Sequence, residues 1–204
     1  MLIVDFSLFS GYFAANSILE NYFNKKNARN MIAGLHAFSS VVANSAYLIT
    51  GNPVLNTLSL NISTGYFLFD GYYIVRFDKL NLLRYFYLYH HFASLFMIKN
   101  YMLFNGANLI ILVAELSNLP SYVIYHYMHI DDEKKNKKTE EIVVTTKKIQ
   151  KVMYGLIRVP VMSYILYDII TSVDFNTPGV SWLIGITFPV YLMGIGWTIK
   201  LLTQ

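Results

Sequence analysis

Two adjacent histidines, His90 and His91, lie at the centre of an apolar, aromatic-rich stretch of the chain, LLRYFYLYHHFASLFMI (residues 82–98). An imidazole can act as a general base, or it can accept an acyl group and pass it on. In a stretch that crosses a membrane, an ionisable side chain is costly and usually has a function. The pair is therefore the first candidate for a catalytic site.

Other apolar stretches carry polar residues that could act together with the histidines. Asp70 and Glu115 are the candidate catalytic acids, because a carboxylate beside an imidazole fixes its tautomer and favours its protonated form. Arg158 would meet the negative charge of a thioester or a lipid. Together with His36 and Asn118, Arg158 forms the candidate substrate-binding set.

The depths of these groups converge when they are counted along helices that rise ~1.5 Å per residue. His36, Asp70, His90 and Arg158 lie about 9–14 Å from the ends of their helices that carry the basic loops, and Glu115 lies about 20 Å in. A charge at the bilayer centre costs at least ~2.5–3.5 kcal/mol on an isolated helix, so these groups should face one another or water. We therefore expect a polar chamber among the helices that opens toward the basic loops.

Structural roles are the alternatives for each of these groups. A histidine in a membrane helix often serves as a hydrogen-bonding group between helices, and this role fits His36 best. Glu115 and Arg158 could form an ion pair, and Asp70 could bond to a tyrosine. Neither an HExxH motif nor repeated ExxH patterns occur, so we expect no metal site.

The composition indicates the elements that would position these residues. Hydrophobic residues make up 55% of the 204, and charged residues only 14%, whereas a soluble domain carries about 25% charge. A helix needs ~20 apolar residues to cross the ~30 Å hydrocarbon layer. The apolar stretches are about that long and predict an all-α, polytopic membrane bundle; they are residues 2–23, 31–49, 55–75, 82–98, 106–128, 149–171 and 180–203.

The loops between these stretches alternate between more and less basic. Loops 24–30, 76–84 and 129–148 carry most of the lysine and arginine, so the positive-inside rule places them in the cytosol together with the C-terminus. Residues 129–148 also contain acidic residues among the lysines, which predicts a solvated loop. Because the lysines fall mainly in loops between the apolar stretches and not along one face, we expect no nucleic-acid partner.

Four motifs follow one another in an order that resembles the TLC domain family, and especially its small TLC-domain-containing branch. They are RNMIAGLHAFSS (29–40), STGYFLFDGYYIV (63–75), YHHFASL (89–95) and LVAELSNLPSYV (112–123). The resemblance implies six helices around a central cavity, here residues 25–204, preceded by an extra hydrophobic segment, residues 1–24. It also implies residence in an endomembrane such as the endoplasmic reticulum, and a lipid-related role.

In the ceramide synthase branch of that family, the histidine pair serves the transfer of a fatty acyl group from coenzyme A to a sphingoid-base amine. The resemblance therefore implies membrane lipids as partners and acyl-CoA as a co-substrate, with no bound cofactor. This chain departs from the synthases in having AELSN (114–118) where they carry a further aspartate-bearing motif, and in lacking a homeobox-like region. A non-catalytic lipid-binding or lipid-homeostasis protein is the alternative, and the oligomeric state is left open.

Overall fold

Each of the predicted apolar stretches forms a helix in the computed structural model, which describes residues 2–100, 106–130, 135–172 and 174–203. No strand occurs within these ranges. The helices are α1 (Leu2–Leu19), α2 (Lys25–Thr50), α3 (Pro53–Phe77), α4 (Leu82–Lys99), α5 (Ala107–Met128), α6 (Lys137–Val152), the π-helix η3 (Met153–Arg158), α7 (Val159–Ser172) and α8 (Val180–Leu202).

Asparagine side chains begin four of these helices. Each accepts a hydrogen bond from a backbone N–H in the first turn, which satisfies a donor that the helix itself leaves free. The four N-cap residues are Asn24, Asn52, Asn81 and Asn136. Gly51 closes α2 with φ of 66°, a left-handed conformation that glycine adopts without steric cost.

Four helices are long and apolar enough to cross a membrane: α2, α5, the continuous helix from Lys137 to Ser172, and α8. The prediction of a helical membrane protein is confirmed to this extent. α1, α3 and α4 are not among the four. α3 and α4 instead bury polar side chains inside the bundle, including Asn61, Asp70 and His91.

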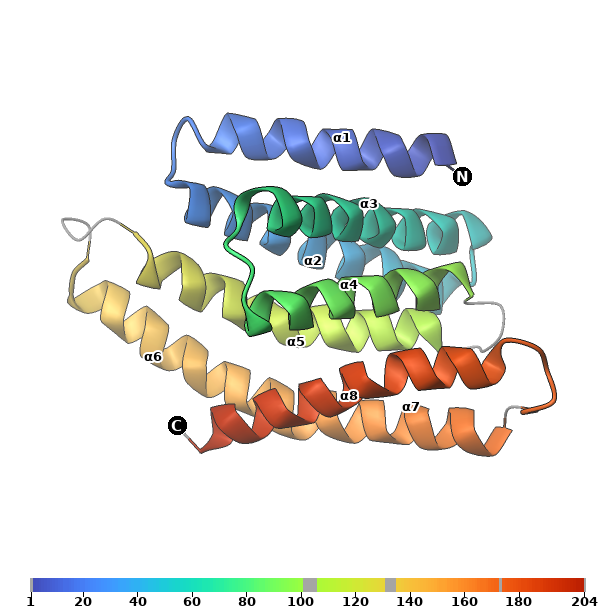
Figure 1. Cartoon of the computed structure of the whole chain (residues 1–204). Coiled ribbons are helices and arrows are strands. Elements are labelled where there is room, and N and C mark those ends of the chain that lie inside the picture. The colour runs from blue at the N-terminus through green and yellow to red at the C-terminus, as the bar shows by residue number, and fades with distance from the viewer. Residues whose placement is uncertain (1, 101–105, 131–134, 173, 204) are drawn as a thin grey trace.

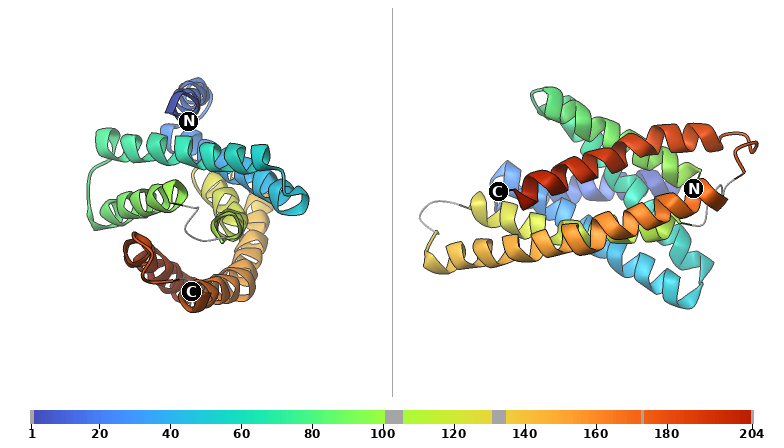
Figure 2. Two further views of the ribbon diagram at one scale, coloured as in Figure 1. Left: turned by 90° about the vertical axis from the view of Figure 1, so that its right-hand side faces the viewer. Right: turned by 90° about the horizontal axis from the view of Figure 1, so that it is seen from below.

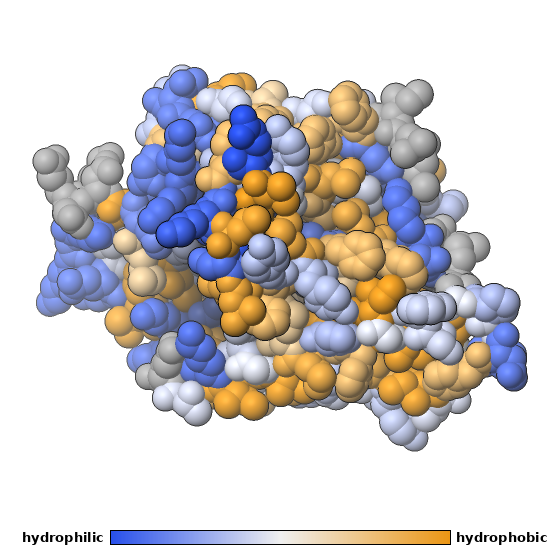
Figure 3. All heavy atoms as spheres, viewed as in Figure 1, coloured by the Kyte–Doolittle hydropathy of each residue, from blue (hydrophilic) through white to orange (hydrophobic). Residues whose placement is uncertain are grey.

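The helices run in alternating directions when α6, η3 and α7 are taken as one continuous helix (Figure 1). The connections after α1, α3 and α5 therefore lie at one end of the molecule, together with the C-terminus, and the N-terminus lies at the other end. The basic loops of the sequence, residues 24–30, 76–84 and 129–148, lie in these connections and in the helix ends beside them. In the same view, many hydrophilic atoms gather at that end and apolar atoms cover much of the middle (Figure 3). The fold thus places the lysine-rich segments together.

The helix α1 lies on the outside of the bundle, against α3 and on the side opposite α7 and α8 (Figures 1 and 2). Gly65 of α3 permits this close approach, because a Cβ atom there would lie 2.6 Å from Cβ of Leu8. Asp5 of α1 is buried and forms an ion pair with Lys99 of α4 at 3.0 Å. α1 is therefore held by both packing and charge.

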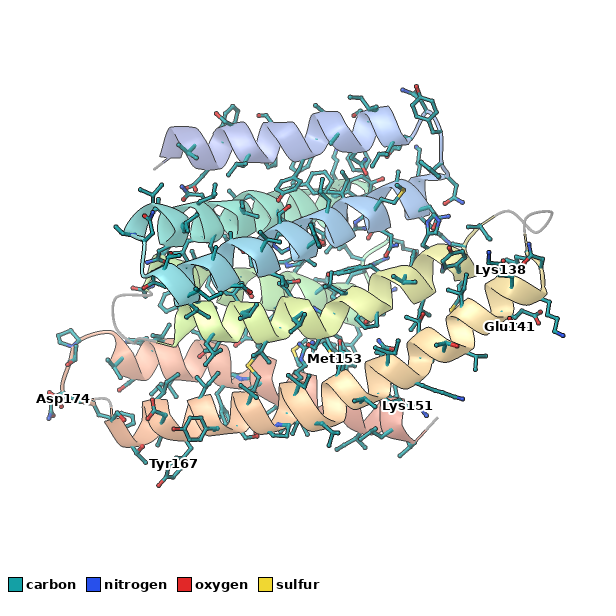
Figure 4. All side chains as sticks on the ribbon, turned by 180° about the vertical axis from the view of Figure 1, so that it is seen from behind. Lys138, Glu141, Lys151, Met153, Tyr167 and Asp174 are labelled. Carbon is teal, nitrogen blue, oxygen red and sulfur yellow. The ribbon has the colours of Figure 1, made fainter. Side chains whose placement is uncertain are left out.

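The prediction of a solvated loop over residues 129–148 is wrong from Lys137 onward. That residue begins a helix of 36 residues that continues to Ser172. The Asn136 cap, an acidic residue in the first turn (Glu140) and lysines nearer the bundle all favour a helix. Figure 4 shows Lys138 and Glu141 at the outer end of this helix and Lys151 pointing away from the bundle. A hydropathy pattern detects only the apolar half of such a helix.

Candidate functional site

Two cavities meet inside the bundle. The polar cavity has a volume of about 410 Å³, and its polar lining residues are Tyr66, Asp70, Tyr87, His90, His91, Glu115, Asn118, Ser121, Tyr122, Gln150, Tyr154, Arg158, Trp197 and Lys200. The apolar cavity has a volume of about 140 Å³ and lies among α4, α5, α7 and α8. Phe67, His90, Glu115 and Arg158 line both cavities. The predicted chamber thus has a polar arm and an apolar arm.

Asp70 holds His91 in a fixed orientation. Asp70 Oδ2 lies 2.7 Å from His91 Nε2, and Asp70 Oδ1 accepts a second hydrogen bond from Arg29 Nε at 2.7 Å. Because an ionised carboxylate only accepts hydrogen bonds, Nε2 of His91 carries the proton of this contact. Of the two acids that the sequence offers for an imidazole, the structure brings Asp70 to His91.

Arg29 extends this network toward the basic end of the molecule. Its Nη1 donates to Asp78 Oδ2 at 2.8 Å, and Arg84 Nε reaches the same oxygen at 3.0 Å. The guanidinium of Arg29 also lies 4.7 Å from the centre of the Tyr73 ring. Sequence reasoning did not name Arg29 as a site residue. The available signal was its position seven residues before His36, on the same helical face.

His90 is the free member of the histidine pair. Its side chain is half-buried and lines both cavities. Its ring lies 6.0 Å from that of Phe67 and 5.5 Å from that of His91, between centroids. The side chain of His90 forms no hydrogen bond or ion pair with any of the described residues. Neighbouring positions on a helix point ~100° apart, which explains why only one of the two histidines reaches Asp70.

Glu115 and Arg158 lie at the junction of the cavities, but they do not pair. Within the described part of the chain, no carboxylate lies within 4.0 Å of the Arg158 nitrogens, so the ion-pair alternative is not realised. Glu115 is buried, and its Oε2 has no hydrogen-bond partner in the described part of the chain. Arg158 Nη1 instead donates to Asn118 Oδ1 at 2.7 Å. Glu115 of the predicted catalytic set, and Asn118 and Arg158 of the predicted substrate-binding set, all line the polar cavity.

The π-helix η3 places Arg158 and Tyr154 beside Asn118. The hydroxyl of Tyr154 donates to Asn118 Oδ1 at 2.6 Å, and the Arg158 guanidinium lies 4.8 Å from the centre of the Tyr154 ring. The wider turn is closed by a bond from the N–H of Val159 to the carbonyl of Tyr154. Single π turns occur often at functional sites. Tyr154 was not among the predicted site residues.

His36 does not line either cavity. It is fully buried, its ring stacks on that of Tyr66 at 4.0 Å between centroids with an angle of 7°, and its Nε2 lies 3.4 Å from Ser63 Oγ. Tyr66 lines the polar cavity. His36 therefore lies behind the wall of the chamber, a place that suits support of Tyr66 rather than contact with a substrate.

Within residues 2–100, 106–130, 135–172 and 174–203, no group of three or more His, Asp or Glu side chains is arranged to hold a metal ion. Comparison of the chain with protein-family models, with curated proteins and with solved structures found no match.

Proposed function

We propose that the chain is a membrane protein of the TLC domain type that transfers an acyl group from acyl-CoA to a lipid amine or hydroxyl. The observation that carries the proposal is the place of His90, an imidazole with no hydrogen-bond partner in the described chain, at the point where an apolar cavity meets a polar one. Acyl transfer to a lipid requires such a junction, because a hydrocarbon chain and a polar reacting centre must be held side by side.

Each arm of the chamber suits one part of the reactants. The apolar arm is lined mainly by aliphatic and aromatic side chains, among them Met97, Ile111, Met162, Leu166 and Leu183, and suits a fatty chain. The polar arm reaches Gln150, Trp197 and Lys200 near the basic end of the molecule. A polar, anionic donor would enter from that end, where the lysines favour its approach.

In this reaction His90 acts as the general base. It takes a proton from the attacking amine or hydroxyl as the new bond to the acyl carbon forms, the thioester C–S bond breaks, and the proton passes to the departing thiolate. Arg158 lies beside the junction, where a cation would stabilise the negative charge that develops on the carbonyl oxygen. In the other route that the residues allow, His90 itself accepts the acyl group before the lipid does.

His91 and Asp70 have a positioning role in this scheme. The bond between them fixes the ring of His91, and His91 in turn packs beside His90. Glu115, with one oxygen unpartnered at the junction, is placed to exchange a proton with the reactants.

The test is an acyl-transfer assay with purified full-length protein in nanodiscs, acyl-CoA and sphingoid bases. Loss of a general base costs about 10²–10⁴-fold in rate, so His90→Ala should reduce product formation by at least about 100-fold. His129→Ala, which changes a histidine outside both cavities, is the matched control and should leave the rate unchanged. Equal turnover in the wild type and in the His90→Ala, His91→Ala double variant would remove the histidines from the mechanism.

A non-catalytic lipid carrier is the second candidate, favoured by the size of the chamber and its apolar arm. It predicts a lipid that copurifies with the protein and no acyl-transfer product. Mass spectrometry of the intact protein separates the two functions, since a covalent acyl adduct on a histidine would contradict the carrier.

We also propose that α1 to α5, the continuous helix from Lys137 to Ser172, and α8 each cross an endomembrane such as that of the endoplasmic reticulum, with the basic connections in the cytosol. The alternating directions of the helices and the gathering of the basic connections at one end support this topology (Figure 1). The location in the cell is supported by the TLC resemblance alone, and microscopy of the tagged protein with an endoplasmic reticulum marker tests it.

A further inference from the structure

One edge of the Arg158 guanidinium has no hydrogen-bond partner among the residues that the structure describes. Nη1 donates to Asn118 Oδ1 at 2.7 Å and approaches Ser117 Oγ at 3.4 Å. Nε and Nη2 form no hydrogen bond with any residue that the structure describes. A guanidinium presents its N–H groups as a rigid fork that matches a carboxylate or phosphate with two parallel hydrogen bonds. Arg158 is thus anchored through one nitrogen and keeps a free bidentate edge.

This free edge lies beside Gly194, which lines the apolar cavity. A Cβ atom added to Gly194 would lie 3.8 Å from Nε and 4.0 Å from Nη2, and Gly194 lines that cavity. The absence of a side chain at Gly194 leaves room beside the fork. Glu115 is the acidic residue that lines both cavities with Arg158, and it does not neutralise the guanidinium by an ion pair. Among the residues that the structure describes, the positive charge of Arg158 therefore has no carboxylate within ion-pair distance where it lines the apolar cavity.

The apolar cavity extends from this charge along α7 and α8. Its lining continues on α7 from Val159 to Ile169 and on α8 from Ile195 to Leu183. Along α7 from Arg158 this is about 16 Å at the ~1.5 Å rise of a helix. The length of an extended hydrocarbon chain of medium length is comparable with this distance. The arrangement is therefore a cation at one end of an elongated apolar space.

We propose that this space binds a free fatty acid, with its carboxylate paired to Nε and Nη2 of Arg158 and its tail between α7 and α8. This goes beyond the proposed acyl transfer, because binding of a free acid requires neither a thioester nor turnover. It holds equally for a carrier and for an enzyme. A phosphate head group offers the same oxyanion chemistry, and the experiment distinguishes the two.

The experiment is equilibrium binding of radiolabelled tetradecanoate to purified full-length protein in nanodiscs at neutral pH. Tetradecanol, tetradecyl phosphate and the free acid are compared as competitors. A hydrogen bond to a charged group contributes about 1.5–3 kcal/mol, so tetradecanoate should bind about 10- to 100-fold more tightly than tetradecanol. Arg158→Gln should remove this difference and leave tetradecanol unaffected. Arg158→Lys, which keeps the charge but loses the fork, should restore only part of it.

Arg76→Gln is the matched control, because Arg76 is exposed on α3 and lies outside both cavities. If Arg158→Gln does not fold, Gly194→Val gives the same test by placing methyl groups against the free edge of Arg158. Equal binding of the acid and the alcohol would overturn the proposal. So would tetradecanoate binding that is unchanged in the Arg158→Gln and Gly194→Val variants. Tighter binding of tetradecyl phosphate than of tetradecanoate would show that the ligand of Arg158 is a phosphate and not a carboxylate.

Discussion

Asp70 joins His91 to Arg29 through its two carboxylate oxygens. Oδ2 lies 2.7 Å from His91 Nε2, and Oδ1 lies 2.7 Å from Arg29 Nε. The three residues come from α3, α4 and α2, so this contact ties α2 to two of the helices that line the polar cavity. Its second consequence is chemical. His91 is fixed in one orientation, and His90, the next residue along, is left without a partner at the junction of the two cavities.

Asp70→Ala should be strongly destabilising. Asp70 is buried, and its loss leaves the Arg29 charge and the His91 ring without their shared acceptor. Breaking a buried ion pair costs about 3–5 kcal/mol. Thermal unfolding in detergent should show a large fall in midpoint temperature, and Asp174→Ala, in the exposed α7–α8 connection, should not. Equal midpoints for the two variants would contradict a structural contribution from the Asp70 network.

A lysine at position 29 should not reproduce the contacts of Arg29, so Arg29→Lys should impair the protein. Arg29 contacts Asp70 through Nε and Asp78 through Nη1, a geometry that a single ammonium group cannot reproduce. If the protein catalyses acyl transfer, we expect Arg29→Lys to lower kcat with little change in KM, because Arg29 does not line either cavity. The measurement is steady-state kinetics beside unfolding curves for both proteins. A rise in KM alone would argue that Arg29 binds substrate.

Gly65→Ala should weaken the docking of α1. The added methyl group would lie 2.6 Å from Cβ of Leu8 and 3.2 Å from the backbone nitrogen of Phe9, so the two helices must separate. Overpacking of this kind costs about 1–3 kcal/mol. Gly71→Ala is the control, since nothing lies within 4 Å of a Cβ there. Limited proteolysis of the α1–α2 connection should be faster in Gly65→Ala alone, and identical rates would show that α1 does not depend on this contact.

Single cysteines should report opposite sides of the membrane at Lys26 and Asp174. The chain contains no cysteine, so Lys26→Cys and Asp174→Cys each introduce a single label site. In sealed microsomes, an impermeant maleimide should modify Lys26→Cys directly and Asp174→Cys only after detergent is added. Labelling of both variants without detergent would refute a topology in which the helices cross the membrane.

Hydropathy located the helices well, because an apolar stretch and its polar ends are properties of the local sequence. The stretch predicted at residues 82–98 is α4, Leu82–Lys99. The same signal missed residues 137–148, where lysine, glutamate and threonine form a helix whose outer half is polar. Whether such a polar segment is helical depends on its N-cap and on the helix propensities of its residues, and not on its hydropathy.

The depth of the site residues along their helices could be estimated from the sequence, but their hydrogen-bond partners could not. Counting residues placed Asp70 and the histidines at similar depth, and the structure brings Asp70 and His91 into contact. The rise of a helix gives no information about its rotation, so the sequence could not decide which histidine would meet Asp70. Nor could it show that Arg158 would bond to Asn118 rather than to Glu115, since this depends on the π turn in η3.

The helix from Lys137 to Ser172 is 36 residues long, or about 54 Å, and so exceeds the ~30 Å thickness of a hydrocarbon layer. In a bilayer its outer turns project as a stiff rod into the surrounding water. The outer turns from Lys137 and the chamber lining at Gln150, Tyr154 and Arg158 belong to this one helix, so a change in its tilt would move both together.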